Sequence, residues 1–290
     1  MWEFIAKPFG IIMEFIYKTL AFENYGLAII FFTIFVRILI LPLTIKQQKS
    51  TIKMQAIQPE LNALKERYGD DKQKLYEEQN KIYQKYGVNS MAGCLPTLIQ
   101  FPMILILYRI IRMPLTYISQ FSSDFIASLA KISGEQAVNE IKIISFFQKS
   151  ADKIAEAIEG TSMTASEFSE KLVNMKFLKI FDLGETPSIF FWKWSGDDWK
   201  VYLPLLIIPI VAFATAWLQQ KLLTPKQDKS KKEDAAGALG MMTKFMPFMS
   251  LFFCFILPAG LGLYFTVGNI LSIGQTTLIN KLYKKKKEGS

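Results

Sequence analysis

The stretch LAIIFFTIFVRILILPLTI, residues 27–45, decides the fold class, because Arg37 is the only charged side chain among its 19 residues. At about 1.5 Å of rise per residue, a helix of this length covers roughly the 30 Å hydrocarbon core of a bilayer. The whole chain has the same character, since 51% of its 290 residues are hydrophobic and only 20% are charged. We therefore predict a membrane protein.

Four further apolar stretches predict four more membrane-spanning helices. The fourth of the five stretches has only about 16 residues, so it either crosses a thinned bilayer or fails to cross. We favour crossing, because the last stretch then returns the basic carboxyl-terminal tail to its proper side. The predicted fold class is an all-α polytopic membrane protein with five transmembrane helices. The predicted spans are residues 27–45, 91–113, 201–220, 242–257 and 260–279.

The charges of the connecting segments predict the orientation of the chain. Residues 46–90 hold nine Lys or Arg against six Asp or Glu, and residues 281–290 hold five against one. Residues 114–200 instead hold nine against twelve. Short basic segments stay in the cytoplasm by the positive-inside rule. We therefore expect 46–90, a loop over 221–241 and a basic tail over 280–290 in the cytoplasm, with the amino terminus and 114–200 outside.

The first 26 residues differ from a spanning helix, because their charges form one narrow stripe. Glu3, Lys7, Glu14 and Lys18 are spaced by four, seven and four residues. On a helix this spacing places them within a wedge of about 60°. Such a helix suits the membrane interface better than the bilayer core. We predict an interfacial amphipathic helix over residues 1–26.

The polar segment 46–90 predicts a helical hairpin. Apolar residues from Ile57 to Tyr68 recur at heptad-like spacing, a break follows at 68–71, and a second helical run ends near Gly87. The hairpin is either a solvated spacer or an element that docks or moves. We favour the second interpretation, because a connector between adjacent spans could be far shorter.

The segment 114–200 predicts short extracytoplasmic helices. Thr164 and Glu167 have the spacing of a capping box, which marks the start of one helix. The acidic residues of this region are scattered, as on a solvated surface. Its role stays open at this stage.

Several classes of chemistry are excluded by composition. The chain has no histidine, so a Ser–His or Cys–His nucleophile is not expected. Its two cysteines, Cys94 and Cys254, lie in apolar runs and suit neither a disulfide framework nor a zinc site. No P-loop pattern indicates nucleotide use. We therefore expect no enzymatic activity, no cofactor and no metal site.

Arg37 is the residue that requires an explanation, because it lies near the middle of the first span. An arginine at the centre of a spanning helix costs about 2.5–3.5 kcal/mol on insertion scales. No Asp or Glu lies in any of the five predicted spans. We therefore predict a water-filled cavity around the guanidinium, where an Asp or Glu of a passing polypeptide supplies the missing anion.

Polar residues of the other spans favour one hydrophilic groove. Thr33 shares the Arg37 face of its helix, and Thr215 and Gln219 stack at a spacing of four. The alternative is that each polar residue forms hydrogen bonds between helices, which suits the Thr and Gln residues singly but not Arg37. The further groove candidates on this basis are Gln100, Thr266 and Asn269.

A small transporter or anion channel is the rival function, with Arg37 as the counter-ion of the substrate. Five spans without an evident inverted repeat weigh against it. So does the lack of an intramembrane acid or histidine for proton coupling. A membrane-embedded enzyme would need a nucleophile–base or metal constellation, and the sequence has none that we recognise.

Three ordered blocks give the chain a family resemblance. FVRILILPLTIKQQKS (35–50), YGVNSMAGCLPTLIQFP (86–102) and PAGLGLYFTVGNILSIGQ (258–275) resemble the YidC family of membrane protein insertases in its compact five-span form. The resemblance implies a groove that is closed to the outside and open to cytoplasm and lipid, with Arg37 as its intramembrane arginine. It also implies the bacterial cytoplasmic membrane as the location.

The resemblance extends to partners and to further groove positions. It implies nascent membrane proteins as clients, delivered by ribosomes or the Sec translocon and released into the lipid bilayer, with no specific nucleic acid. The hairpin of residues 46–90 would assist recruitment. The polar groove position at the end of the third span falls on Gln219 or Gln220, and the aromatic one falls on Phe265. Family forms with Trp or Tyr at that last position differ from this chain, which also lacks a lipid-acceptor cysteine and a large outer domain.

Overall fold

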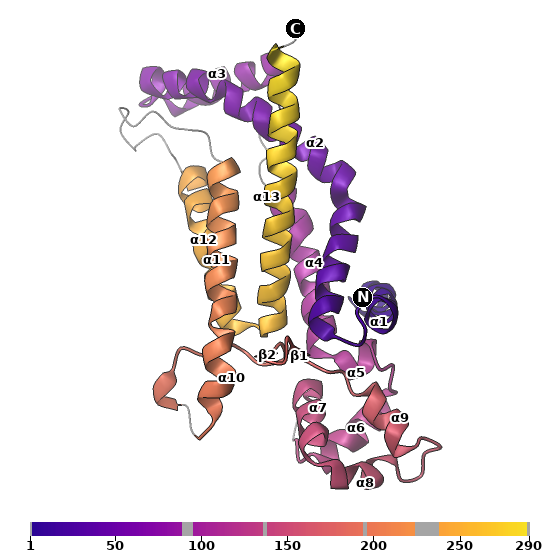
Figure 1. Ribbon diagram of the computed structural model, residues 1–290. Coiled ribbons are helices and arrows are strands. Elements are labelled where there is room, and N and C mark those ends of the chain that lie inside the picture. Colours follow the sequence, from indigo (N-terminus) through magenta and orange to yellow (C-terminus); the bar gives the residue numbers. More distant parts are fainter. Residues whose placement is uncertain (1, 89–94, 136–137, 194–195, 224–237, 289–290) are drawn as a thin grey trace.

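Five long helices lie side by side and form the body of the molecule, as the computed structural model shows (Figure 1). The structure describes residues 2–88, 95–135, 138–193, 196–223 and 238–288. Three of the five helices run in one direction, and α4 and α12 run in the other. The five are α2 (Tyr25–Tyr68), α4 (Leu95–Arg112), α11 (Ile207–Leu223), α12 (Ala238–Ile256) and α13 (Ala259–Glu288).

The length of the apolar helices is consistent with a helical membrane protein. Within the described ranges two helical stretches are long and apolar enough to cross a bilayer, namely α2 and residues Asp198–Leu223. A shorter apolar stretch, Pro247–Ile256, lies within α12. The prediction of a mostly helical membrane protein therefore holds at this level. The count of five spans stays a prediction.

Helix α2 is longer than the sequence patterns suggest. We expected a span over 27–45 and a separate hairpin over 46–90, whereas α2 continues unbroken through Pro42 and Pro59. Its start is capped by Asn24, whose side chain accepts a hydrogen bond from the amide of Leu27 at 3.0 Å. The first arm of the hairpin is therefore the continuation of the same helix that carries Arg37.

The turn of the hairpin lies where the heptad pattern places it. Helix α2 ends at Tyr68, and Asp71 caps α3 (Lys72–Tyr86) by accepting a hydrogen bond from the amide of Lys74 at 3.1 Å. Helix α3 ends at Gly87, whose φ of 58° is left-handed and suits a glycine. The two arms pack through Ile57, Leu61 and Val88.

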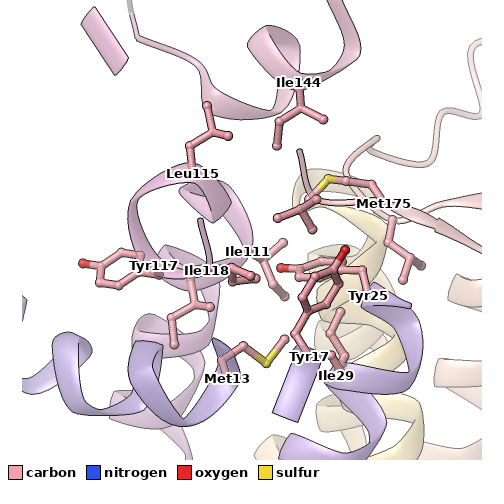
Figure 2. Packing of buried hydrophobic residues seen from close by; sticks show 14 of the residues in the cluster. Met13, Tyr17, Tyr25, Ile29, Ile111, Leu115, Tyr117, Ile118, Ile144 and Met175 are labelled. Atoms are coloured by element: carbon pink, nitrogen blue, oxygen red, sulfur yellow. The ribbon is translucent and has the colours of Figure 1, made fainter. Parts of the chain in front are cut away.

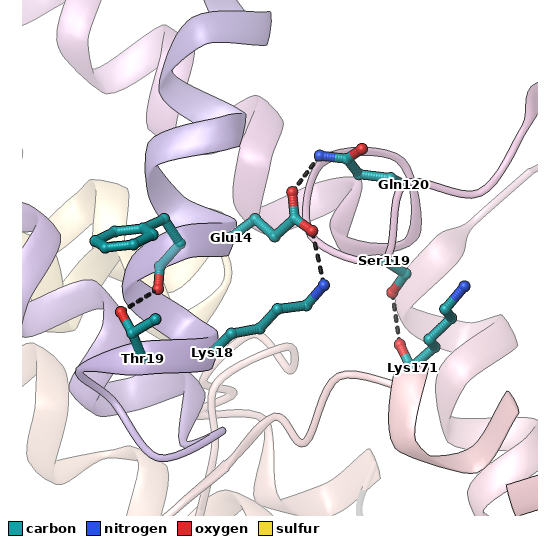
Figure 3. Close-up of polar contacts among 7 residues, drawn as sticks. Glu14, Lys18, Thr19, Ser119, Gln120 and Lys171 are labelled. Atoms are coloured by element: carbon teal, nitrogen blue, oxygen red, sulfur yellow. Dashed lines mark hydrogen bonds and ion pairs between the residues drawn. The ribbon is translucent and has the colours of Figure 1, made fainter. Parts of the chain in front are cut away.

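Helix α1 (Trp2–Thr19) packs against the bundle on one side (Figure 2). Met13 and Tyr17 are buried beside Ile111 and Ile118 of the neighbouring segment. On the opposite side Ile11 and Phe15 are exposed. Glu14 forms an ion pair with Lys18 at 2.7 Å and accepts a hydrogen bond from Gln120 (Figure 3). The predicted helix is present, and its place at a membrane interface stays a prediction.

The region 114–200 contains a small helical body with an aromatic core. Phe121, Phe125, Phe147 and Phe168 contact one another within it. The predicted capping box is confirmed at the start of α9. The helices are α5 (Pro114–Tyr117), α6 (Ser123–Ile132), α7 (Glu140–Lys149), α8 (Ile154–Ile158) and α9 (Ala165–Lys171).

One carboxyl group is buried where this body meets α5. Glu140, the first residue of α7, is 2% exposed and accepts hydrogen bonds from the amide of Thr116 at 3.0 Å and from its hydroxyl at 2.5 Å. Burial raises the pKa of Glu140, although the two bonds to Thr116 oppose the rise. The pair fixes α7 to α5.

A two-stranded hairpin is a local exception to the predicted all-α fold. Strands β1 (Lys176–Phe177) and β2 (Phe181–Asp182) pair antiparallel within the region that we expected to be helical. The turn places Leu178 and Lys179 at φ values of 52° and 61°. Bulky residues rarely adopt this conformation, and the segment lacks the Asn-Gly signal of a tight turn. The sequence therefore gave no local indication of the hairpin.

The β-hairpin connects the starts of two long helices. The ring of Phe177 lies directly over Gly26 in the first turn of α2, so closely that a side chain at position 26 would collide with it. On the other side, the carbonyls of Leu183 and Glu185 accept hydrogen bonds from the amides of Gly260 and Ala259 at 2.9 and 2.8 Å. These amides are free donors at a helix start. One segment therefore holds α2 and α13 together at the same end.

Two further boundaries differ from the predicted ones. The expected span over 201–220 consists of α10 (Asp198–Leu205) and α11, which meet at Leu206. Helix α13 runs on to Glu288, so the backbone of the basic tail over 280–290 is helical up to that residue. Most of the expected loop over 221–241 lies outside the described residues.

We predict that Gly26→Ala destabilises the protein by about 1–3 kcal/mol, because the added methyl group meets the Phe177 ring. An alanine in place of glycine normally stabilises a helix. Gly274→Ala is the matched control, since its Cβ would meet nothing within 4 Å. Denaturant unfolding in detergent micelles measures the effect. In a Phe177→Ala background the cost of Gly26→Ala should nearly vanish, and an unchanged cost would show that the ring is not the cause.

Candidate functional site

Helices α2 and α13 pack in parallel and in register, and this contact contains Arg37. Gln275 donates a hydrogen bond from Nε2 to the hydroxyl of Thr44 at 2.9 Å, across 231 positions of sequence. The same offset relates Arg37 to Gly268. A Cβ on that glycine would lie 3.0 Å from Nη2 of the arginine. The offset also relates Ile29 to Gly260, and each pair lies about two helical turns from the next.

Helix α11 packs against another side of α13, also in parallel. Asn269 donates hydrogen bonds from Nδ2 to the hydroxyl of Thr215 at 3.3 Å and to the carbonyl of Ala212 at 3.4 Å. Seven residues earlier on both helices, a Cβ on Gly262 would lie 2.6 Å from Cγ2 of Ile208. Helix α13 therefore lies between α2 and α11, as Figure 1 also shows.

Arg37 is half-buried and points towards α13. Its guanidinium lies against Gly268, where the missing side chain leaves room for it. Among the described residues no Asp or Glu forms an ion pair with Arg37. The guanidinium thus packs against a glycine of α13 and has no carboxylate partner in the part of the chain that the structure describes.

The structure brings some of the predicted groove residues together. Thr215 and Asn269 are bonded partners on α11 and α13, and Arg37 contacts α13 one residue before Asn269. Gln219 and Gln220 are both half-buried near the end of α11, so burial does not distinguish them.

Three other candidates lie in different surroundings. Thr33 is fully buried and donates its hydroxyl to the carbonyl of Ile29 at 2.6 Å, so its polar group is satisfied within α2. Thr266 likewise donates to Gly262 within α13 at 2.9 Å. Phe265 packs at the margin of the hydrophobic core, with its ring 5.8 Å from that of Tyr264. The side chain of Gln100, on α4, lies outside the described residues.

Sequence reasoning missed the residues of α13 that receive the first helix. Gly268 and Gln275 are seven residues apart, and so are their partners Arg37 and Thr44 on α2. A shared heptad spacing on two helices was the available signal. It could not be used without knowing that these two helices are neighbours.

The described residues show no arrangement suited to a metal. No group of three or more His, Cys, Asp or Glu side chains comes together in the part of the chain that the structure describes. Cys254 is buried, 3.3 Å from the position of a Cβ on Gly262. The polar atoms of the site are amides, hydroxyls and one guanidinium, which bind and orient but do not form a nucleophile–base pair.

Comparison with known proteins identifies the family. Residues 15–287 match the family described as 60Kd inner membrane protein. The chain belongs to this family. The resemblance to YidC proteins is confirmed, because the family match covers nearly the whole chain and relatives named YidC match it as well.

Individual relatives agree with the family assignment. The membrane protein insertase MisCA of Bacillus subtilis is 32% identical over 96% of this chain and 78% of its own length. Membrane protein insertase YidC 2 of Bacillus anthracis is also 32% identical, over 96% and 80%. The membrane protein insertase YidC of Clostridium tetani is 28% identical over 97% of this chain and 94% of its own length.

We predict that the Asn269–Thr215 bond contributes about 0.6 kcal/mol to stability, the average for polar contacts between membrane helices. Asn269→Ala, Thr215→Ala and the double variant form a cycle that isolates this coupling. Thr277→Ala is the control, because its hydroxyl bonds the Ile273 carbonyl of its own helix. Unfolding in detergent micelles measures the cycle, and strictly additive single effects would show that the bond contributes nothing.

Proposed function

We propose that this chain is a membrane protein insertase of the bacterial cytoplasmic membrane, which moves client transmembrane segments from the cytoplasm into the bilayer. Membership of the 60Kd inner membrane protein family supports an insertase role. So do the relatives that are named membrane protein insertases. The single observation that carries the mechanism is the position of Arg37, a cation on an apolar helix with no carboxylate partner among the described residues.

Arg37 would act as the receptor for a negative charge on the client. In water a pair of charges 4 Å apart gains about 1 kcal/mol, and at a lower effective dielectric constant it gains several times more. The contact with Gly268 holds the guanidinium beside α13. An Asp or Glu near the translocating end of the client would pair with it for a time. The attraction requires only a negative charge, so clients of otherwise unrelated sequence could bind.

The polar residues where α11 meets α13 would form the rest of the client-binding groove. Thr215 and Asn269 already exchange a hydrogen bond there, and both are half-buried. Gln219 or Gln220 would add a further polar side chain to the groove on its cytoplasmic side. Apolar parts of the client would leave sideways into lipid, and their burial at roughly 25 cal/mol per Å² would supply the free energy without nucleotide hydrolysis.

The α2–α3 hairpin would receive clients on the cytoplasmic side. In this topology the amino terminus lies outside and the carboxyl terminus lies in the cytoplasm, with five spans between them. Nascent chains would arrive from the ribosome or the Sec translocon. Gln55 on α2 donates a hydrogen bond to the Leu223 carbonyl at the end of α11, so the base of the hairpin contacts the helix that lines the groove.

We predict that Arg37→Ala lowers insertion of a single-span client with an acidic translocated tail by about tenfold, equivalent to about 1.4 kcal/mol. Arg37→Lys should largely retain activity, because the charge matters more than the shape of the guanidinium. Insertion into vesicles that contain the purified full-length protein measures both effects.

A matched client and a matched variant control this experiment. A client whose tail carries Asn and Gln in place of Asp and Glu should respond little to Arg37→Ala. Lys131→Ala removes an exposed cation from α6 and should leave insertion unchanged. Undiminished insertion of the acidic client by Arg37→Ala would refute the proposed mechanism. Solute flux through the same vesicles would favour a transporter instead.

We predict that deletion of residues 50–86 lowers client delivery and leaves the helical bundle folded. The deletion removes the hairpin arms that pack on each other through Ile57 and Leu61, which belong to a cluster separate from the main core. Protease resistance of the bundle and client crosslinking in vesicles measure the two effects. Loss of the truncated protein from the membrane would instead assign the hairpin a structural role.

A further inference from the structure

A cavity of about 320 Å³ lies at the end of the molecule opposite the α2–α3 hairpin, where α4, α7 and α10 come close together. This volume is at the lower end of the range of small-molecule sites, which is about 300–1,000 Å³. The proposed client-binding groove does not include it. Backbone and polar side chains from the segment after β2 form one wall. Its described lining residues include Arg112, Lys142, Glu185, Ser188, Asp198 and Tyr202.

Charges of both signs face this cavity. Arg112 and Lys142 supply two cations from the end of α4 and the start of α7, and both are exposed enough to meet a ligand. Lys142 also reaches Glu135 at 3.6 Å. Glu185 and Asp198 supply two carboxylates from the β2–α10 side. The cavity therefore suits a small ligand that carries an anion and a cation a few bonds apart.

Glu185 is half-buried, whereas Arg112 and Lys142 are exposed. Burial and the neighbouring Asp182 raise its pKa, and Lys149 and Lys142 act in the opposite direction. A poorly solvated carboxylate is stabilised in its charged form by an additional cation at close range. Its backbone is fixed, because the Glu185 carbonyl bonds the amide of Ala259 at 2.8 Å.

Large exposed apolar side chains lie next in sequence to several residues that line the cavity. Ile189 and Phe190 follow Ser188 directly, and both are exposed. On α10, Trp199 and Leu203 flank Asp198 and Tyr202 and are 52% and 54% exposed. Exposed aromatic and aliphatic residues at the end of apolar helices are typical of the boundary between lipid and water. A ligand with a charged head and hydrocarbon chains matches this combination.

We propose that the cavity binds the headgroup of a phosphoethanolamine lipid of the outer leaflet. Arg112 and Lys142 hold the phosphate, since guanidinium and ammonium groups are the usual partners of phosphate oxygens. Glu185 and Asp198 hold the ammonium. The acyl chains lie along the exposed apolar residues of α10 and of the segment that follows Ser188. The site shares no residue with the groove at Arg37, so either assignment can fail without the other, and its place in the outer leaflet rests on the orientation proposed above.

The bound lipid would fix the outer ends of three helices to one another. Arg112 ends α4, Asp198 begins α10, and the Glu185 backbone holds the start of α13. A phosphoglycerol lipid offers the phosphate without the ammonium, so it brings no added cation to the half-buried Glu185. The cavity should therefore discriminate between these two lipid classes through its acidic side.

Native mass spectrometry of the full-length protein from nanodiscs that hold equal fractions of phosphatidylethanolamine and phosphatidylglycerol tests the proposal. We expect the wild type to retain the ethanolamine lipid about tenfold more than the glycerol lipid. The reason is that its ammonium forms charge-assisted hydrogen bonds with the acidic side of the cavity. Glu185→Gln should abolish this preference. Arg112→Gln should lower retention of both lipids. Lys142→Gln, at an exposed position, replaces Arg112→Gln if that variant does not fold.

Two controls sharpen the outcome. Lys131→Gln and Glu159→Gln remove exposed charges of the same region outside the cavity and should behave as wild type. Soluble phosphoethanolamine, added at the concentration of the lipid, should not displace it. Displacement would show that the site takes the free headgroup, which overturns the lipid assignment. Equal retention of the two lipids by the wild type, or cavity variants that match the controls, would overturn the site itself.

Discussion

The close parallel packing of α13 between α2 and α11 is the constraint on which the rest of the structure depends. It is possible because glycines stand at the contacts. Gly260 faces Ile29, Gly262 faces Ile208 and Gly268 faces Arg37. Side chains at the first two positions would push the helices apart, and a side chain at the third would displace the guanidinium. Close approach through small residues is a general solution for helices in lipid, where the hydrophobic effect does not drive helices together.

The two ends of this packed core are held by different means. At one end the β-hairpin contacts the first turn of α2 through Phe177 and bonds the first amides of α13 through Leu183 and Glu185. At the other end the helices continue past the core, and α2 becomes the first arm of the hairpin. Hydrogen bonds of main-chain groups at helix starts are short and specific, so the first end is the more constrained. Client entry, as proposed, would take place at the other end.

The sequence predicted this fold well where one physical signal dominates. Apolar length identified the helices, and the break in the heptad pattern located the turn near Tyr68. The β-hairpin was missed because its turn residues, Leu178 and Lys179, adopt a left-handed conformation that such residues rarely take, so local preference did not indicate a turn there. Arg37 was identified from the free-energy cost of an arginine at the centre of a membrane-spanning helix. Its neighbours Gly268 and Gln275 were not, since helix adjacency is a property of the whole bundle. Thr33, Thr266 and Thr215 look alike in sequence, and each hydroxyl donates to a carbonyl of its own helix. Only the structure shows that the Thr215 hydroxyl also accepts a hydrogen bond from Asn269 of a neighbouring helix.

The uninterrupted course of α2 gives Pro42 a mechanical meaning. A proline has no amide hydrogen, so the carbonyl four residues earlier, that of Ile38, loses its helical partner and the helix bends most easily at that point. Pro42 stands between Arg37 and the hairpin arm. Thr44, two residues beyond the proline, accepts a hydrogen bond from Gln275 of α13, and Arg37, five residues before it, lies against Gly268. Helix α13 therefore braces α2 on both sides of Pro42.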